Sequence, residues 1–313
     1  MKISKSPRVN LSVILPVYNG MPVVKNTIDN LLSQRTSDVF SYELIVVDDG
    51  STDNLLNYLE ERKSFRIKIV ELDRNSGRAL ACNAGIRAAN GEVVGFIDAD
   101  CAFVNDDALL KHYESVRNNK EGSYGGLRAE SRNKFWKTYQ ENVFSKWKEE
   151  LGKGSIEAIS STNLFVPVEW FKLEVFSPLY KGYGFEDRDL LIRMKSHGKK
   201  ISFCDGALVI HYSPTYIAEL VQKMYEMGCF SGEVFSQLHY SEYVSSNYAK
   251  VDPRVNKGLL VKILYALYPF LAGKTNFIDM LLSNKSCFPY VLKNAVVKLV
   301  LASAYAAGVN RRL

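Results

Sequence analysis

Two apolar stretches near the start of the chain, LSVILPVYN at residues 11–19 and YELIVVDDGSTDN at residues 42–54, set the plan of the molecule. Each is a short apolar run that stops at polar residues and a turn signal, which is typical of a buried strand followed by a loop. Residues 22–33 are expected to form a helix after the first run. After the second run, Ser51 or Asp53 is expected to cap the start of a helix. Strands that alternate with helices indicate a parallel sheet covered by helices.

The same alternation continues through the first two thirds of the chain. A polar and aromatic segment at residues 127–154 is expected to form a helix and a mobile loop. Further strands are expected at residues 67–72, 92–100, 158–167 and 200–211, and further helices at 79–89 and within 182–198. The predicted fold class is therefore α/β, with a mostly parallel central sheet flanked by helices, over residues 1–213.

Strand signals end after Tyr212, and residues 214–313 are predicted to form a second, helical region. Its apolar segment at residues 259–272 is shorter than the ~20 residues that span a bilayer. The segment at 290–307 carries Lys293, Asn294 and Lys298 on one stripe, as an interfacial helix does. We therefore expect these helices to lie on a membrane surface and not to cross it.

Composition excludes several classes of protein. With 47% hydrophobic and 24% charged residues the chain is neither disordered, collagen-like nor an ordinary polytopic membrane protein. The five cysteines lie far apart without a CxxC pair, and the polar, basic N-terminus has no signal-peptide core. These features predict a reduced, cytoplasmic location.

Charge is concentrated at the C-terminal end. Residues 251–313 carry a net charge of +7, whereas residues 1–250 sum to −1. Because these bases alternate with Leu, Val, Tyr and Phe, residues 254–312 are expected to meet an anionic membrane surface and not nucleic acid. A solvated basic face and a homo-oligomer interface are the alternatives.

Three of the predicted strands end in residues that can bind a ligand. Ligands of open α/β sheets sit at the carboxyl ends of the strands, so these residues are expected to form one site. They are Tyr18 with Asn19, Asp48 with Asp49, and Asp98 with Asp100.

The sequence Asp98-Ala99-Asp100 predicts a site for a divalent cation. Carboxylates two residues apart point to the same side of an extended chain, close enough to share one Mg²⁺ or Mn²⁺ that completes its shell with phosphate oxygens. His211, at the end of another predicted strand, offers a neutral nitrogen to the same ion. The alternatives are a hydrated loop for the carboxylates and a hydrogen-bonded rim residue for His211.

Glu186 and Asp187 stand before an amphipathic helix in a glycine-rich stretch, where one carboxylate can act as a general base. The alternative is that they only complement the helix dipole. Arg188, Asp189 and Arg193 fit an i to i+4 surface pattern. The aromatic residues Trp136 and Trp147 are candidates to stack on an acceptor sugar, with burial in the core as the alternative.

In their order and spacing, these motifs resemble the family 2 glycosyltransferases, which have the GT-A nucleotide-sugar-binding fold. The matching pieces are SVILPVYNG, IVVDDGSTDN, NSGRALACNAGIRAANGEVVGFIDAD and GYGFEDRDLLIRMKSHGKKI followed by VIH, and they cover residues 11–211.

The resemblance implies a role for each motif. In the family, the nucleoside is held after the first two strands, the diphosphate and sugar by the NxGxxxAxNxG stretch, the metal by the DxD element, and the acceptor proton by the ED element. The implied donor-binding residues are Pro16, Tyr18, Asp48, Asp49, Asn75, Gly77, Arg78, Asn83 and Asp98; the implied metal ligands are Asp100, Asp98 and His211; and the implied catalytic pair is Asp187, as base, with Glu186.

The implied reaction is inverting transfer of a sugar from a nucleotide-diphosphate sugar, with UDP favoured, to a hydroxyl of a glycan or lipid-linked acceptor. It needs Mn²⁺ or Mg²⁺ and no protein nucleophile. One alternative is a catalytically silent nucleotide-sugar-binding scaffold subunit. A second is a sugar-phosphate nucleotidyltransferase, from which a basic N-terminal phosphate loop is expected, whereas LPVYNGMPV has no base before Lys25.

Overall fold

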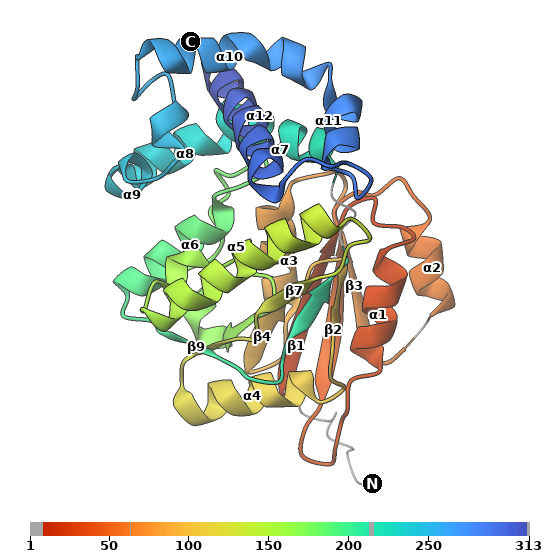
Figure 1. Cartoon of the computed structure of the whole chain (residues 1–313). Coiled ribbons are helices and arrows are strands. Elements are labelled where there is room, and N and C mark those ends of the chain that lie inside the picture. The colour runs from red at the N-terminus through yellow and green to blue at the C-terminus, as the bar shows by residue number, and fades with distance from the viewer. Residues whose placement is uncertain (1–8, 63, 213–215, 312–313) are drawn as a thin grey trace, which may run out of the picture. The chain divides into compact units, whose positions relative to one another are not determined.

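The computed structural model describes residues 9–62, 64–212 and 216–311, which form two compact units (Figure 1). The predicted domain boundary at residues 213 and 214 and the basic residue Arg312 lie outside the described residues. The first unit contains the described residues of 1–130, 143–177 and 190–212, and the second those of 131–142, 178–189 and 213–313.

The first unit is built on a seven-stranded sheet with the order β3-β2-β1-β4-β8-β6-β9. Strand β1 (Leu11–Val17) lies between β2 (Tyr42–Asp48) and β4 (Val93–Phe96) and runs parallel to both. Strand β3 is parallel to β2 and β9 to β6, while β8 is antiparallel to β4 and β6. The mostly parallel central sheet is thus confirmed. The remaining strands are β3 (Ile67–Glu71), β6 (Gly122–Tyr124), β8 (Leu164–Pro167) and β9 (Ile201–Phe203).

Helices cover the sheet, which explains why β1 and β2 are almost continuously apolar. The one buried polar pair between them is satisfied, since the Ser12 hydroxyl donates to the Glu43 carboxylate over 2.6 Å. Helix α3 packs closely on β1, because a Cβ at Gly85 would lie 2.5 Å from Ile14 Cγ2. The helices and short 3₁₀ turns are α1 (Val24–Leu32), α2 (Leu55–Glu61), α3 (Arg78–Ala88), α4 (Ala108–Asn119), α5 (Lys134–Gly152), α6 (Glu186–Ser196), η1 (Ile156–Ala158) and η2 (Val168–Lys172).

Three of the predicted strands are wrong in extent. The strand expected at residues 92–100 ends at Phe96, and the chain then turns, with the Cys101 amide donating to the Asp98 carbonyl over 3.2 Å. After the turn, β5 (Cys101–Phe103) joins β10 (Val209–His211) and β7 (Leu127–Ala129) in a separate small sheet. Residues 200–211 form two short strands because Gly206, at φ +84°, turns the chain between them, and only the end of 158–167 is a strand.

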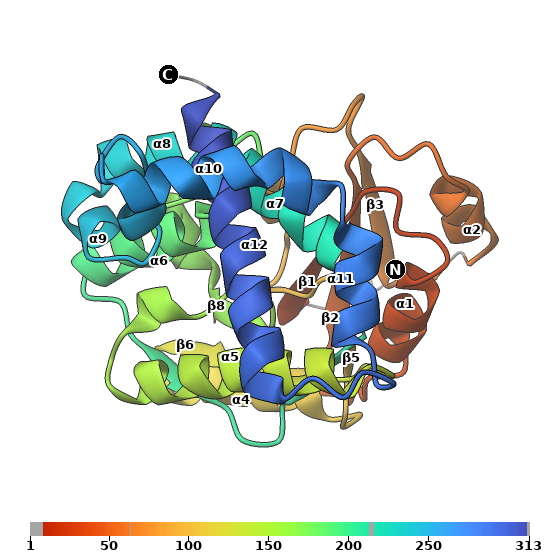
Figure 2. The same cartoon turned by 45° about the horizontal axis from the view of Figure 1, so that its top comes forward.

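The described part of the second unit contains no strand, so the predicted helical region is confirmed. Helix α12 packs against α7 and crosses α10 (Figure 2). Its contact with α7 is close, since a Cβ at Gly308 would lie 2.1 Å from the Tyr225 carbonyl oxygen. The C-terminal helices are α7 (Ile217–Cys229), α8 (Ser231–Leu238), α9 (Tyr240–Val244), η3 (Ala249–Val251), α10 (Leu259–Ala272), α11 (Thr275–Leu282) and α12 (Tyr290–Asn310).

The basic stripe predicted on α12 is wrong at Lys293. This side chain is buried, and its Nζ donates to the Ser283 carbonyl over 2.9 Å. Among the described helices, α12 alone is long and apolar enough to cross a membrane, yet 44% of its most apolar window is buried inside the structure. Helix α12 is therefore partly buried against the other helices of this unit and partly exposed.

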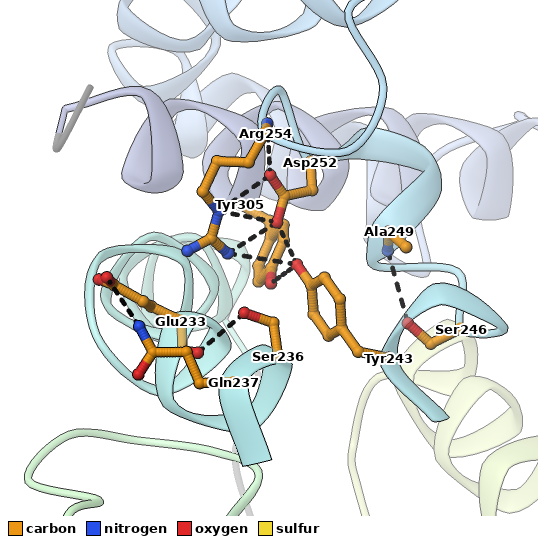
Figure 3. A network of polar contacts seen from close by, with 9 residues as sticks. All are labelled: Glu233, Ser236, Gln237, Tyr243, Ser246, Ala249, Asp252, Arg254 and Tyr305. Carbon is orange, nitrogen blue, oxygen red and sulfur yellow. Dashed lines mark hydrogen bonds and ion pairs between the residues drawn. The ribbon is translucent and has the colours of Figure 1, made fainter. Parts of the chain in front are cut away.

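A buried polar network ties the loop after α9 to α12 (Figure 3). The Asp252 carboxylate accepts a short hydrogen bond from the Tyr243 hydroxyl and pairs with Arg254, whose Nη2 lies 2.7 Å from Asp252 Oδ2. The hydroxyls of Tyr243 and Tyr305 are 2.7 Å apart. Burial raises the pKa of both phenols, so they stay neutral and can donate. The carboxylate is buried but fully hydrogen-bonded, the condition under which such a charge is tolerated.

Candidate active site

The loops that follow β1 and β2 are joined by hydrogen bonds. Asn19, in the left-handed region at φ +47°, accepts the Thr52 amide on its Oδ1 over 2.8 Å. The Asp53 carboxylate accepts the Met21 amide over 2.9 Å, and it also accepts the Leu55 amide at the start of α2. Tyr18, predicted to contact the nucleoside, lies exposed on the first of these loops. The structure thus fixes the two predicted nucleoside loops to each other.

Asp49 holds the next loop in place. Its two oxygens accept the amides of Ser76 and Gly77 over 2.7 and 3.0 Å. Burial raises the pKa of Asp49, and these two amides oppose that effect. The neighbouring Asp48 accepts the Ser51 amide over 2.8 Å. The carboxylate of Asp49 therefore positions the loop that carries Gly77, at φ +89°, and it retains lone pairs for a ligand.

The carboxylate of Asp98 is held by the side chains of Arg78 and Thr162. One oxygen accepts Arg78 Nη2 over 2.9 Å, and the other accepts a short hydrogen bond from the Thr162 hydroxyl. Arg78 also donates to the Ser161 hydroxyl over 3.0 Å. Burial acts to raise the pKa of Asp98, but the charge of Arg78 and the Thr162 hydrogen bond outweigh it and lower the pKa. Asp98 therefore stays ionised.

Asp100 lies beside His211, with 3.3 Å between Asp100 Oδ2 and His211 Nε2. The antiparallel register of β5 and β10 creates this pair, because it places Cys101 opposite His211. The ligand atoms of Asp100, Cys101 and His211 all lie within 4.8 Å of one another. The extended strand expected at residues 98–100 is wrong, since residues 98–101 form a turn. Asp98 and Asp100 have different hydrogen-bond and ion-pair partners, although the charge of His211 also acts on Asp98.

The Asp100 and His211 pair fits a divalent cation. Adjacent ligands of an octahedral ion with bonds of about 2.1 Å are roughly 3 Å apart, close to the 3.3 Å seen here. A carboxylate and an imidazole suit Mn²⁺ better than Mg²⁺, which prefers oxygen alone. Cys101 is buried and offers sulfur, a soft ligand that such ions disfavour. These two side chains would hold the ion and leave most of its shell to phosphate oxygens and water.

The turn before β8 supports Asp98 and was missed in the sequence. Asn163, buried at φ +61°, donates from its amide nitrogen to the carbonyls of Gly126 and Ala207 over 2.7 and 2.8 Å. Its oxygen therefore accepts from His112 Nε2 over 2.9 Å, which leaves His112 Nδ1 to accept the Ser123 hydroxyl. Burial lowers the pKa of His112 to about 3, so the imidazole is neutral. This network fixes the turn that presents the hydroxyl groups of residues 161 and 162.

Two residues predicted to contact the sugar donor, Asn75 and Asn83, lie in different surroundings. Asn75 is exposed, and its Oδ1 accepts the Gly77 amide over 3.1 Å. Asn83 is buried, and its side-chain amide exchanges two hydrogen bonds with the backbone of Phe176, at 2.8 and 3.0 Å. These two hydrogen bonds position the Asn83 amide, which keeps one further N–H and one further lone pair, so its predicted contact with the sugar donor stays a prediction.

Glu186 and Asp187 belong to the second unit, where they open α6. The preceding Phe185 has φ +68° and stacks on Phe235 with ring centroids 4.5 Å apart. Glu186 is buried whereas Asp187 is half-buried, so of the two carboxylates Asp187 is the more accessible to an acceptor. Their place in the first turn also suits the helix dipole.

The surface pattern predicted for Asp189 and Arg193 is wrong. Asp189 is fully buried and pairs with His239, with 2.8 Å between Asp189 Oδ1 and His239 Nε2. Arg193 instead pairs with Glu174. Burial raises the pKa of Asp189, and the hydrogen bond from His239 opposes this. Because the partner is 50 residues away, the periodicity of α6 contains no signal for this pair.

The two tryptophans proposed for the acceptor differ. Trp136 is 1% exposed and packs with Phe135 and Ile217 in the core of the second unit, so it presents no free ring face to a sugar. Trp147 is half-buried in the first unit, 5.4 Å from the ring of Phe144. Phe144 in turn meets His211 edge-on at 6.1 Å. Only Trp147 remains an acceptor candidate, and the ring of Phe144 contacts both Trp147 and His211.

Comparison with known proteins defines the class. The family model for glycosyl transferase family 2 matches residues 12–180, more than half of the chain, and the chain belongs to this family. It is 32% identical over 115 residues to the poly(ribitol-phosphate) beta-glucosyltransferase of Bacillus spizizenii, covering 36% of this chain and 18% of the relative. It is 37% identical over 106 residues to the dolichyl-phosphate beta-glucosyltransferase of Mus musculus, covering 31% and 33%.

Solved structures share the GT-A fold. Mannosyltransferase PcManGT from Pyrobaculum calidifontis, in complex with GDP-Man and Mn²⁺, gives a TM-score of 0.59 at 19% identity over 97% of this chain and 88% of that one. Residues 1–349 of S. aureus TarS in complex with UDP give 0.56 at 18% identity over 97% and 91%. The chain covers a third or less of the two curated relatives named above, so their activities are not transferred as a whole.

Proposed function

We propose that the chain is an inverting glycosyltransferase that moves a sugar from a nucleotide-diphosphate sugar to a hydroxyl group of a glycan or lipid-linked acceptor. The observation that carries this proposal is the Asp100 and His211 pair, 3.3 Å apart at the carboxyl end of the sheet strands. A donor diphosphate needs a cation, and this pair offers two ligands to one. UDP is the favoured nucleotide, and the donors bound by the solved relatives, UDP-GlcNAc and GDP-Man, support this donor class.

The donor would be held by the first unit. The loops carrying Tyr18 and Asp49 would bind the nucleoside, and the loop from Asn75 to Arg78 would lie along the diphosphate. Asp98 would orient Arg78, because their ion pair fixes the guanidinium. A cation held by Asp100 and His211 would neutralise the negative charge that develops on the departing diphosphate.

The transfer would be a single displacement. Asp187 would remove the proton from the acceptor hydroxyl as that oxygen bonds to the anomeric carbon, and the bond between this carbon and the diphosphate oxygen would break with its electron pair on the diphosphate. Glu186 would orient the acceptor. No activated serine or cysteine is needed, and the buried thiol of Cys101 is kept neutral by its raised pKa.

Location and acceptor belong to the same proposal. The second unit is basic and exposes many apolar side chains, which supports a peripheral position on the cytoplasmic face of a membrane. A lipid-linked acceptor is accessible there. Trp147 is the residue proposed to stack on the acceptor.

A panel of UDP-, GDP- and TDP-sugars tests the proposal, with release of nucleoside diphosphate measured in Mn²⁺, Mg²⁺ or chelator. One donor should be hydrolysed slowly without acceptor, and only with metal. Binding without any release, with or without acceptor, would favour the silent scaffold subunit. Release of pyrophosphate from a sugar phosphate and a nucleoside triphosphate would favour the nucleotidyltransferase.

A further inference from the structure

Helix α10 is apolar on both of its faces, and only one of them is covered by protein. Val261 and Leu264 are buried, and Tyr268 and Leu271 pack against the core of the second unit. The opposite face is exposed, although a surface helix ordinarily turns polar residues to solvent. This uncovered stripe, called here the α10 face, consists of Leu260, Ile263, Leu267 and Phe270, spaced three, four and three residues apart.

The apolar surface continues beyond α10 along the chain. Phe277 and Met280 of α11 are exposed, as are Phe288 in the loop before α12 and Val291 and Leu292 in its first turn. A monomeric soluble protein seldom exposes so many large apolar side chains in one region. This many exposed apolar side chains in one segment indicates that an apolar partner covers the α10 face.

The exposed charges of the segment that carries the α10 face have one sign. Within residues 255–310 of the described chain, every exposed charged side chain is a lysine. The one acid there, Asp279, is half-buried and accepts the amide of Ile217 over 3.1 Å. The lysines are Lys257, Lys262, Lys274, Lys285 and Lys298.

We propose that the α10 face is a docking surface for an anionic lipid bilayer, with its apolar stripe in the acyl boundary and the lysines among the headgroups. This inference deepens the membrane partner of the proposed function. The charge pattern favours lipid over a second copy, because a two-fold interface brings a patch against itself and would face these lysines with lysines. At 14 residues α10 is about 21 Å long, too short to cross the hydrocarbon core and suited to lying along it.

Vesicle flotation of the full chain tests the proposal. The probes are vesicles of phosphatidylcholine alone and of phosphatidylcholine with one third phosphatidylglycerol. The wild type should float with the anionic vesicles, bind the neutral ones weakly, and lose most of the difference at about 1 M salt, where exposed charges are screened. The same protein preparations are assayed for donor hydrolysis without vesicles. This distinguishes failure of the membrane-docking proposal from failure of the proposed enzymatic function.

The decisive variant replaces Leu260, Ile263 and Phe270 together by Gln, which keeps helix propensity. Its partition onto anionic vesicles should fall by about tenfold or more, with donor hydrolysis unchanged. The matched control makes the same change at three exposed apolar residues of the first unit, Val39, Phe65 and Leu173, and should bind as the wild type does.

A charge variant tests the lysines separately. Replacing Lys262, Lys274 and Lys285 by Gln should remove the preference for anionic vesicles, whereas the same change at Lys120, Lys146 and Lys172 should leave it. Two results would overturn the proposal. One is an active wild type that floats with neither vesicle. The other is a wild-type dimer, seen by sedimentation velocity, that the α10 variant converts to a monomer, since a second copy would then be the occupant.

Discussion

The two units place their paired carboxylates differently. In the first unit, Asp49, Asp98 and Asp100 stand in the loops at strand ends. Asp49 bonds to loop backbone, and the other two pair with side chains from other elements. These are carboxylates proposed to act on the donor and its metal. In the second unit, Asp189 and Asp252 are fully buried and pair with residues that only hold helices together. Burial alone therefore does not separate the structural carboxylates from those proposed for chemistry. Their position does: strand ends in the first unit, and the start of α6 in the second.

The largest effect is expected from Asp187→Asn, because it removes the proposed base from the second unit. Transfer should fall by about 100- to 10,000-fold, the range for loss of general acid–base catalysis. Donor affinity, measured by isothermal titration, should stay unchanged, since the donor loops lie in the first unit.

Glu219→Gln is the control for Asp187→Asn, because Glu219 is an exposed carboxylate in the first turn of α7. It should lower stability slightly through the helix dipole and leave transfer intact. Full activity in Asp187→Asn would assign Asp187 to that structural role instead.

Tyr305→Phe should break the buried network of the second unit without touching the chemistry of the first. Loss of the hydroxyl removes the 2.7 Å hydrogen bond to Tyr243 and should lower the free energy of unfolding by about 1–3 kcal/mol. Denaturant unfolding measures this change. Tyr240→Phe, at a 66% exposed side chain, is the matched control and should change little. Equal stability of the two variants would show that the network contributes nothing net.

Thr162→Val should weaken the support of Asp98 in the first unit. The valine keeps the shape of the side chain but leaves one Asp98 oxygen without its hydroxyl donor, which should lower kcat/KM by about tenfold, in keeping with the loss of one hydrogen bond to a charged group. Thr162→Ser restores the donor and should restore most of the rate. If valine and serine behave alike, packing and not the hydrogen bond is what matters at this position.

His112 should make the stability of the chain depend on pH in a defined direction. Its pKa is about 3 in the folded state and ordinarily near 6.5, so between these values the unfolded state binds more protons. Stability contributed by the neutral imidazole is complete above pH ~6.5 and is lost as the pH falls, by up to about 1.4 kcal/mol per pH unit.

The comparison of His112→Gln with the wild type isolates this contribution, because glutamine does not titrate. Denaturant unfolding at pH 7 and pH 5 should show a smaller decrease for the variant. Parallel decreases in the two proteins would mean that His112 does not stay neutral in the fold.

Sequence predicted the first unit well because its signals are local. Apolar runs that end in polar residues mark the strand ends, and the family motifs occupy them. Asp98 and Asp100 also show the limit of such signals: the sequence predicted an extended strand up to Asp100, but residues 98–101 form a turn in which the Cys101 amide donates to the Asp98 carbonyl. The periodicity of apolar residues contains no signal for this turn.

The second unit could be predicted only as helical. Asp189 and His239 are 50 residues apart, and Tyr243 and Tyr305 are 62 apart, so no window of sequence joins them. Lys293 shows the same limit for a residue that was predicted to be exposed. Its position in α12 suggested a solvated basic stripe, but the side chain is buried and its ammonium group donates to backbone carbonyls. Such burial depends on tertiary contacts and not on the helix itself.

Donor affinity with and without Mn²⁺ in the wild type and in Asp100→Asn is the most direct test of the proposed metal-dependent donor site. Isothermal titration of the nucleotide sugar should show affinity at least about tenfold higher with Mn²⁺ than with chelator in the wild type, and little difference in Asp100→Asn. Asp205→Asn, at an exposed carboxylate in the turn between β9 and β10, should behave as the wild type does. Equal affinity with Mn²⁺ and with chelator in the wild type would contradict the assignment of Asp100 and His211 as metal ligands.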